Sequence, residues 1–127
     1  MKRSGSHAVV IGGSITGLVA ARSLAGHFER VTLVERDRFP EGPEGRKGTP
    51  QARHVHVLLK QGERILDRYF PGLVAEMIRE GAELCDMSGD TKWFYFGNWK
   101  VRFASGFPLM CQSRLYLETA ASSKSCT

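Results

Sequence analysis

Two glycines and an acid near the amino terminus have the types and spacing of a nucleotide-binding site. Gly12 permits a tight turn, and Gly17 lacks a side chain, so a helix beginning between them can lie close to the preceding strand. The free amides and the dipole at the start of such a helix suit a pyrophosphate. Glu35 follows 18 residues after Gly17, where a carboxylate accepts hydrogen bonds from a ribose 2′-hydroxyl and repels a 2′-phosphate. The predicted diphosphate site consists of Gly12, Gly13, Ser14, Ile15, Thr16 and Gly17.

The elements that must position these residues can be read from hydrophobic spacing. Residues 8–11 are a β-branched run typical of a buried strand, residues 18–25 have helical spacing, and residues 31–34 form a second apolar run. This order predicts a Rossmann-like βαβ unit with a parallel sheet, of the α/β class. Ser14 replaces the second glycine of the usual fingerprint, and its hydroxyl can donate to a phosphate oxygen. A βαβ unit with a purely structural role is the alternative.

Three other motifs overlap this stretch. Residues 12–16 nearly match the nucleophile elbow Gly-x-Ser-x-Gly, but Thr16 takes the place of its last glycine. A phosphate loop of the Walker type needs Lys followed by Ser or Thr after Gly17, where the chain has Leu18 and Val19. A signal peptide would leave the apolar run at 31–34 and Glu35 unexplained. The dinucleotide interpretation accounts for more of the residues than these three.

Composition narrows the classes of protein. With 127 residues the chain is long enough for one small core, and its 42% hydrophobic content is ordinary for a globular protein. Eighteen Lys and Arg against 13 Asp and Glu give a net charge of +5, without the basic, aromatic-interleaved helix of a nucleic-acid binder. No apolar run predicts a stable membrane span. The three cysteines lack zinc or disulfide spacing, which predicts no metal site and reduced thiols in a cytoplasmic protein.

The rest of the chain falls into short predicted elements. Residues 1–6 read as a flexible polar arm, and residues 36–53 as a loop rich in proline, glycine and charge that either folds over a cofactor with its cations or is a disordered surface loop. Helices are predicted over 54–70, 73–80 and from an N-cap at Ser113. Strands are predicted over 82–86, 93–96, 100–104 and 109–111, with a hairpin turn at Gly97-Asn98. The aromatic residues near 92–111 are expected in a core or in a substrate-region wall, and residues 119–127 in an irregular tail.

Four motifs in this order resemble a known family. They read VVIGGSITGL (9–18), VTLVERD (31–37), RKGTPQARHVH (46–56) and SRLYLE (113–118). They are similar to the amino-terminal portion of FAD-dependent monooxygenases, which are the flavin aromatic hydroxylases and their relatives among halogenases and geranylgeranyl reductases. The resemblance spans residues 7–118 and implies an FAD-binding domain that includes the start of a β-rich substrate region.

The resemblance also implies roles for individual residues. FAD would be held with its pyrophosphate on residues 12–17 and its adenosine ribose on Glu35, with Arg36 beside the adenosine. Arg114, in an Arg-x-x-Leu pattern, would reach FAD from the third helix, and Gln112 would touch the ribityl chain. Arg53 and His54 would lie near the flavin. In the full-length family NAD(P)H is an electron donor, and the substrate is a small organic molecule.

The chain departs from this family in length. Members are much longer, and their chain returns in a later segment with a Gly-Asp motif that holds the ribityl and pyrophosphate groups; no such returning segment exists in this sequence. We therefore expect a truncated part of a monooxygenase or oxidoreductase that is not catalytically complete alone. No catalytic acid or base can be named, and the oligomeric state stays open. The alternatives are a non-catalytic remnant and a small adenine-dinucleotide-binding module.

Overall fold

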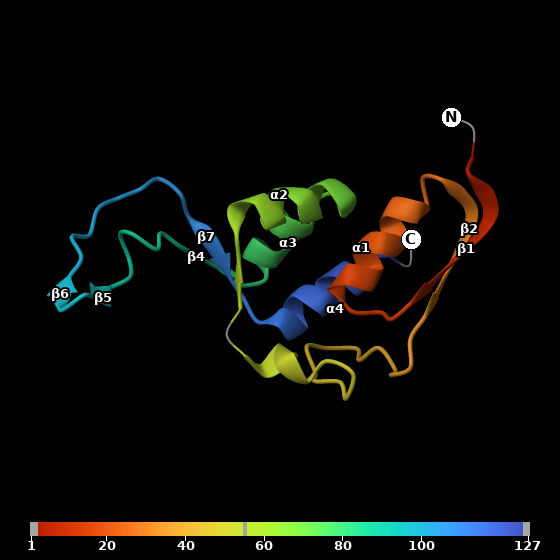
Figure 1. Cartoon of the computed structure of the whole chain (residues 1–127), viewed down its shortest axis with the longest axis horizontal. Helices are drawn as coiled ribbons and strands as arrows, with labels where there is room; N and C mark the ends of the chain where they lie inside the picture. The colour runs from red at the N-terminus through yellow and green to blue at the C-terminus, as the bar shows by residue number, and fades with distance from the viewer. Residues whose placement is uncertain (1–2, 55, 126–127) are drawn as a thin grey trace.

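The computed structural model describes residues 3–54 and 56–125 and begins with a parallel pair of strands joined by a helix (Figure 1). Strand β1 (Gly5–Ile11) leads into helix α1 (Ile15–Leu24), which returns to strand β2 (Phe28–Val34). Val10 of β1 pairs with Leu33 of β2, so the predicted βαβ unit is confirmed. The strand begins at Gly5, earlier than predicted, and the Ser4 amide donates to the His27 carbonyl. Residues 4–6 are therefore not a free arm, and Met1 and Lys2 lie outside the described residues.

Only one face of this parallel pair is covered by α1. Side chains alternate between the faces of a strand, and Val10 and Leu33 point toward the helix and the core. Val9, Ile11 and Val34 point the other way, and Ile11 is 87% exposed. The prediction that residues 8–11 form a buried strand was therefore wrong except on the inner face. A parallel sheet is normally covered on both faces, and in the described residues the outer face is open.

The core lies among the four helices that the described residues form. After α1 these are α2 (Lys60–Tyr69), α3 (Leu73–Arg79) and α4 (Arg114–Ser125). Pro71 and Gly72 separate α2 from α3 as predicted, with Gly72 at a φ of 79°. The buried side chains come from all four helices and from three positions outside them, which are the residue after α2, the segment after α3 and strand β7: Leu18, Leu66, Phe70, Leu73, Met77, Ala82, Met110, Leu117, Ala120 and Ala121. No helix in the described part of the chain could cross a membrane.

The fourth helix corrects the expectation of an irregular tail at 119–127. Helix α4 continues to Ser125, and Cys126 and Thr127 lie outside the described residues. Ala120 and Ala121 are buried in the core one turn after Leu117. These small side chains allow α4 to pack closely against α1. The polar composition of residues 119–127 gave no indication of this contact. Ser113 caps the helix as predicted, because its hydroxyl accepts a hydrogen bond from the Tyr116 amide at 3.1 Å.

The segment before α2 is less helical than its spacing indicated. The loop after β2 ends in one turn of 3-10 helix (η1, Pro50–Arg53), and a short strand β3 (Val57–Leu58) precedes α2. Helix α2 therefore begins at Lys60 and not at residue 54. Strand β3 pairs antiparallel with β7 (Leu109–Cys111), which also pairs with β4 (Glu83–Cys85). Pairing with β7 is a long-range contact that local periodicity does not report.

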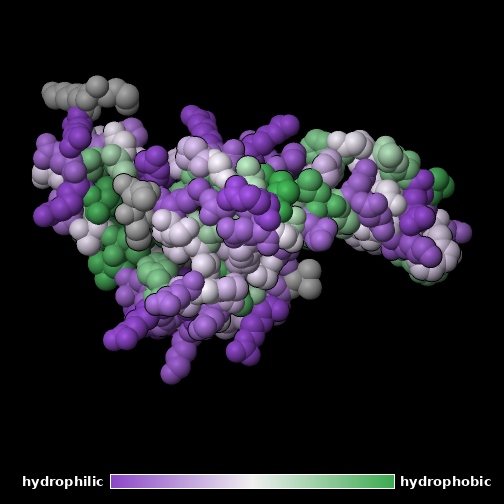
Figure 2. Space-filling model, turned by 180° about the vertical axis from the view of Figure 1, so that it is seen from behind, coloured by the Kyte–Doolittle hydropathy of each residue, from purple (hydrophilic) through white to green (hydrophobic). Residues whose placement is uncertain are grey.

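An arm of residues 86–107 projects away from the helices (Figure 1). Its only regular structure among the described residues is a hairpin of β5 (Phe94–Tyr95) and β6 (Asn98–Trp99). The turn lies at Phe96 and Gly97, both with positive φ, and not at Gly97-Asn98 as predicted; residues 100–104 form no strand. Hydrophobic and hydrophilic patches lie side by side on its surface (Figure 2). Its aromatic side chains are exposed, so the expectation that they form part of a core was wrong for the described residues.

Candidate functional site

The chain between β1 and α1 makes a sharp bend from strand to helix. Gly12 has a φ of 101°, a conformation that L side chains rarely adopt, and its amide donates to the Val34 carbonyl at 2.8 Å. Ser14 is the N-cap residue of α1 in an extended conformation, without a side-chain cap on the helix amides. The first amides of α1 therefore have no capping side chain of their own. The bend has the geometry that the glycine spacing predicted.

Gly17 allows the helix to approach the turn. A Cβ built on Gly17 would run into the carbonyl oxygen of Gly12 and lie 2.9 Å from its carbonyl carbon. A Cβ on Gly12 would meet nothing within 4 Å. The two glycines thus have different physical roles, because Gly12 is needed for its backbone conformation and Gly17 for the close contact.

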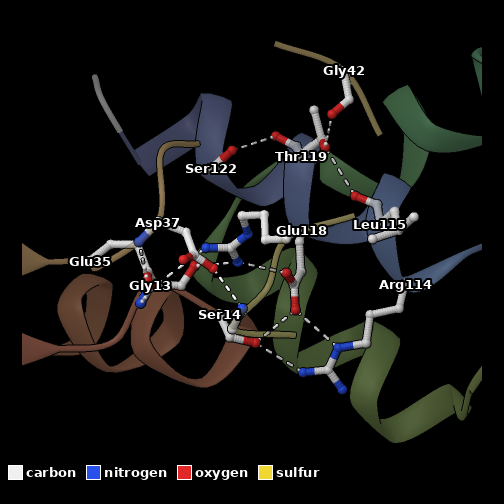
Figure 3. A network of polar contacts seen from close by, with 12 residues as sticks. Gly13, Ser14, Glu35, Asp37, Gly42, Arg114, Leu115, Glu118, Thr119 and Ser122 are labelled. Atoms are coloured by element: carbon white, nitrogen blue, oxygen red, sulfur yellow. Dashed lines mark hydrogen bonds and ion pairs between the residues drawn. The ribbon is translucent and has the colours of Figure 1, made fainter. Parts of the chain in front are cut away.

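The carboxylate of Glu35 points at the turn. Its Oε2 accepts a hydrogen bond from the Gly13 amide at 2.5 Å, and its Oε1 accepts one from the Asp37 amide at 2.9 Å (Figure 3). These two amides, first Asp37 and then Gly13, lower the pKa of Glu35 below its ordinary value, and the charge of Arg46 adds to the effect. Glu35 is therefore ionised at neutral pH, next to the turn as predicted.

A second acid, Glu118 on α4, reaches the same turn. The Ser14 hydroxyl donates to Glu118 Oε1 at 2.7 Å, and Arg114 Nε donates to the same oxygen at 3.0 Å (Figure 3). Arg114 Nη2 also donates to the Ser14 hydroxyl at 3.0 Å. Arg114, the first residue of α4, thus lies at the glycine turn, and its contact with FAD stays a prediction. The hydroxyl of Ser14, which we expected to face a phosphate, is held by protein groups.

Arg46 is the buried cation at this turn. Its Nη2 donates to Glu118 Oε2 at 2.8 Å and to the Gly13 carbonyl at 3.3 Å, and its Nη1 lies 3.2 Å from Glu35 Oε2. The side chain is 6% exposed, and its guanidinium carbon lies 5.0 Å from the centre of the Phe39 ring. The sequence predicted only that cations of the 36–53 loop come near the site. It gave no signal that singled out Arg46.

The charges at the turn balance. Arg46 and Arg114 carry two positive charges, and Glu35 and Glu118 carry two negative ones. Burial raises the pKa of Glu118, but hydrogen bonds from Ser14, Arg46 and Arg114 outweigh burial and lower it overall. The four charges and the Gly13 amide, which is bonded to Glu35, form one polar cluster at the turn, and both guanidiniums contact residues of the turn.

Other predicted site residues are not joined to this cluster by a described contact. The Arg36 side chain is 77% exposed and pairs with its neighbour Asp37 at 3.6 Å. Arg53 and His54 are exposed, and within the described chain the Arg53 side chain makes no hydrogen bond or ion pair. Gln112 follows β7, and its Oε1 is buried without a hydrogen-bond partner. Thr16 is exposed, whereas Ile15 packs on the core.

An apolar groove of about 970 Å³ lies beside the cluster but does not include it. Its walls come from α1, β2, the loop near Phe39 and the second half of α4, and none of residues 12–17 lines it. Neither Arg46 nor Arg114, the two cations at the glycine turn, lines this groove. The groove and the turn are therefore separate features of the surface.

The fold described above is a mixed α/β unit in which one parallel strand pair carries a glycine turn. We compared the chain with known proteins. No family model matches the chain. A stretch of 84 residues is 45% identical to Protein Rv3254 of Mycobacterium tuberculosis. The match covers 66% of this chain and 18% of that protein, so the chain spans about a fifth of the relative's length.

Proposed function

We propose that the turn between β1 and α1 binds the diphosphate of an adenine dinucleotide, and that this dinucleotide is FAD. The observation that carries the proposal is the contact of Gly17 with Gly12, which brings the start of α1 against the end of β1. A ligand phosphate placed there would meet helix amides and the positive end of the helix dipole. Helix α1 has no acidic residue in its first turn that would oppose an anion.

Glu35 supplies the second half of the proposed site. It lies at the carboxyl end of β2. Its Oε2 faces the turn and accepts from the Gly13 amide, and its Oε1 accepts from the Asp37 amide just after the strand. A carboxylate oxygen has more than one lone pair, so each can also accept from a ribose hydroxyl. An ionised acid at this position favours an unphosphorylated ribose, because it repels a 2′-phosphate.

The choice of FAD rests on the resemblance to flavin-dependent monooxygenases and on the position of Arg114 beside Ser14. When bound, FAD supplies hydride transfer and oxygen chemistry, and the protein orients it. In this proposal the chain's own residues bind and orient, with the amides of α1 toward the diphosphate and Glu35 toward the ribose. A small organic substrate and NAD(P)H as the donor belong to the proposal for a whole protein of this type.

Calorimetry with ADP tests the proposal, because ADP carries the diphosphate and the ribose without the flavin. We expect saturable binding that is weaker for Glu35→Ala, which loses the ribose acceptor, and for Gly12→Val, which cannot adopt a φ of 101° without strain. Gly26→Ala is the matched control, because its Cβ would make only an ordinary contact at 3.7 Å with the Ser23 carbonyl. Equal affinity in all four proteins would refute the proposed site.

FAD absorbance separates the flavin proposal from a general dinucleotide module. If the purified chain takes up FAD and ADP displaces it, the flavin proposal is supported. If ADP and NAD bind and FAD does not, a small adenine-dinucleotide module is the better description.

A further inference from the structure

Glu118 is a buried carboxylate with an unusual set of partners. Its side chain is 7% exposed, and it accepts hydrogen bonds from Ser14, Arg46 and Arg114. These partners come from the glycine turn, from the 36–53 loop and from α4 itself. Burying an ionised carboxylate is costly unless it is paired and hydrogen-bonded. Three donors on two oxygens satisfy that condition.

Both guanidiniums held by Glu118 also contact the glycine turn. Arg46 donates to the Gly13 carbonyl at 3.3 Å, and Arg114 donates to the Ser14 hydroxyl at 3.0 Å. Two guanidiniums this close to one turn repel each other unless an anion lies between them. Glu118 is that anion, since its two oxygens take one guanidinium each.

The cluster keeps an unused hydrogen-bond donor. Arg46 Nη1 is buried and has no hydrogen-bond partner, although it lies within ion-pair distance of Glu35. A buried donor without an acceptor is disfavoured. The other nitrogen, Nη2, donates to Glu118 at 2.8 Å, the shortest of the polar contacts that hold this guanidinium.

We propose that Glu118 is a positioning residue for the diphosphate site. It does not touch the nucleotide, and it holds the Arg46 and Arg114 guanidiniums at the glycine turn so that they face the phosphates when these arrive. This inference rests on the proposed function. The role assigned to Glu118, an acid of α4 that lies 104 residues after Ser14, concerns the phosphates: we expect the affinity for the diphosphate to depend on Glu118 and the affinity for the nucleoside not to.

The test compares ADP with adenosine in the wild type and in Glu118→Gln, by calorimetry for ADP and by NMR titration for adenosine. The amide keeps the shape of the side chain but removes the charge and one acceptor. We expect ADP affinity to fall about tenfold, the order that one hydrogen bond to a charged group contributes. Adenosine affinity should stay within about twofold, because Glu35 is unchanged. Glu76→Gln is the matched control, since Glu76 is also an ion-paired acid, bonded to Lys124 at 2.6 Å on α3 and α4.

A second variant keeps the test decisive if Glu118→Gln folds poorly. Arg46→Lys keeps the positive charge but loses the fork that contacts both Glu118 and Gly13, so we expect the same selective loss of ADP affinity. In the double variant Glu118→Gln, Arg46→Lys the two losses of ADP binding free energy should not add, because both substitutions disrupt the same contact between Arg46 and Glu118.

The outcomes separate the two claims. If the wild type binds ADP no better than adenosine, the proposed diphosphate site is wrong and the role of Glu118 falls with it. If the wild type prefers ADP but Glu118→Gln leaves that preference intact, or loses ADP and adenosine equally, the positioning role alone is overturned.

Discussion

Adding one methyl group at Gly17 should destabilise the protein, although alanine favours helices. Gly17 is the third residue of α1, where Gly→Ala gains about 1 kcal/mol of helix propensity. The new Cβ would meet the backbone of Gly12, including its carbonyl carbon at 2.9 Å, and backbone cannot move as a side-chain end can. Overpacking of this kind typically costs about 1–3 kcal/mol, and contact with backbone belongs at the upper end. We expect a net loss of about 1–2 kcal/mol in the free energy of unfolding.

Gly62→Ala is the matched control for this substitution. Gly62 is the third residue of α2, which has the same ten-residue length as α1. Its Cβ would lie 3.0 Å from Leu58 Cδ1, the end of a flexible side chain. This variant should therefore be neutral or up to about 1 kcal/mol more stable. Urea unfolding followed by circular dichroism measures both. Equal stability of the two variants, or the reverse order, would refute the close contact between α1 and the turn.

Three further substitutions test other parts of the structure. Ser113→Ala should cost about 1 kcal/mol of stability in urea unfolding, because it removes the N-cap of α4, whereas Ser123→Ala in the same helix should change it by less than about 0.5 kcal/mol. The pKa of Asp86, lowered to about 2 chiefly by the Ser105 hydroxyl, should rise toward 3.8 in Ser105→Ala when titrated by NMR, and an unchanged pKa would contradict that bond. Because the folded-state pKa of Glu118 is lowered, its stabilisation is fully present above its ordinary value of 4.5 and is lost as the pH falls through the folded pKa. The difference in unfolding free energy between wild type and Glu118→Gln should therefore shrink below pH 4.5, and a pH-independent difference would oppose this origin.

The sequence predicted the βαβ unit because its signals are local. Two short runs of apolar, mostly β-branched residues, a glycine turn and helical spacing lie within 30 residues, and Glu35 follows at a distance set by the helix length. The residues of the turn and Arg114 could be named for the same reason, since each belongs to a short motif. The positions of Gly12, Gly17 and Glu35 agree with the geometry that those motifs require.

Long-range contacts explain what the sequence did not predict. Arg46 and Glu118 are 72 residues apart, and one of them lies in a loop without periodicity. The second half of α4 is held by burial of Ala120 and Ala121, small residues that carry no hydrophobic stripe. The arm carries aromatic residues in an alternating pattern that is typical of a half-buried sheet, yet Phe96 is 88% exposed. A pattern of hydrophobic and polar residues shows which side chains could be buried. It does not show whether another segment packs against them and buries them.

NMR mapping of bound ADP on the ¹⁵N-labelled chain tests the central claim most directly. If the diphosphate rests on the start of α1, the amide signals of Ser14, Ile15, Thr16 and Gly17 will shift most, and those of the β5–β6 hairpin will stay in place. If the largest shifts fall in the arm or in the groove beside α4, or if no signal moves at saturating ADP, the proposed nucleotide site is contradicted.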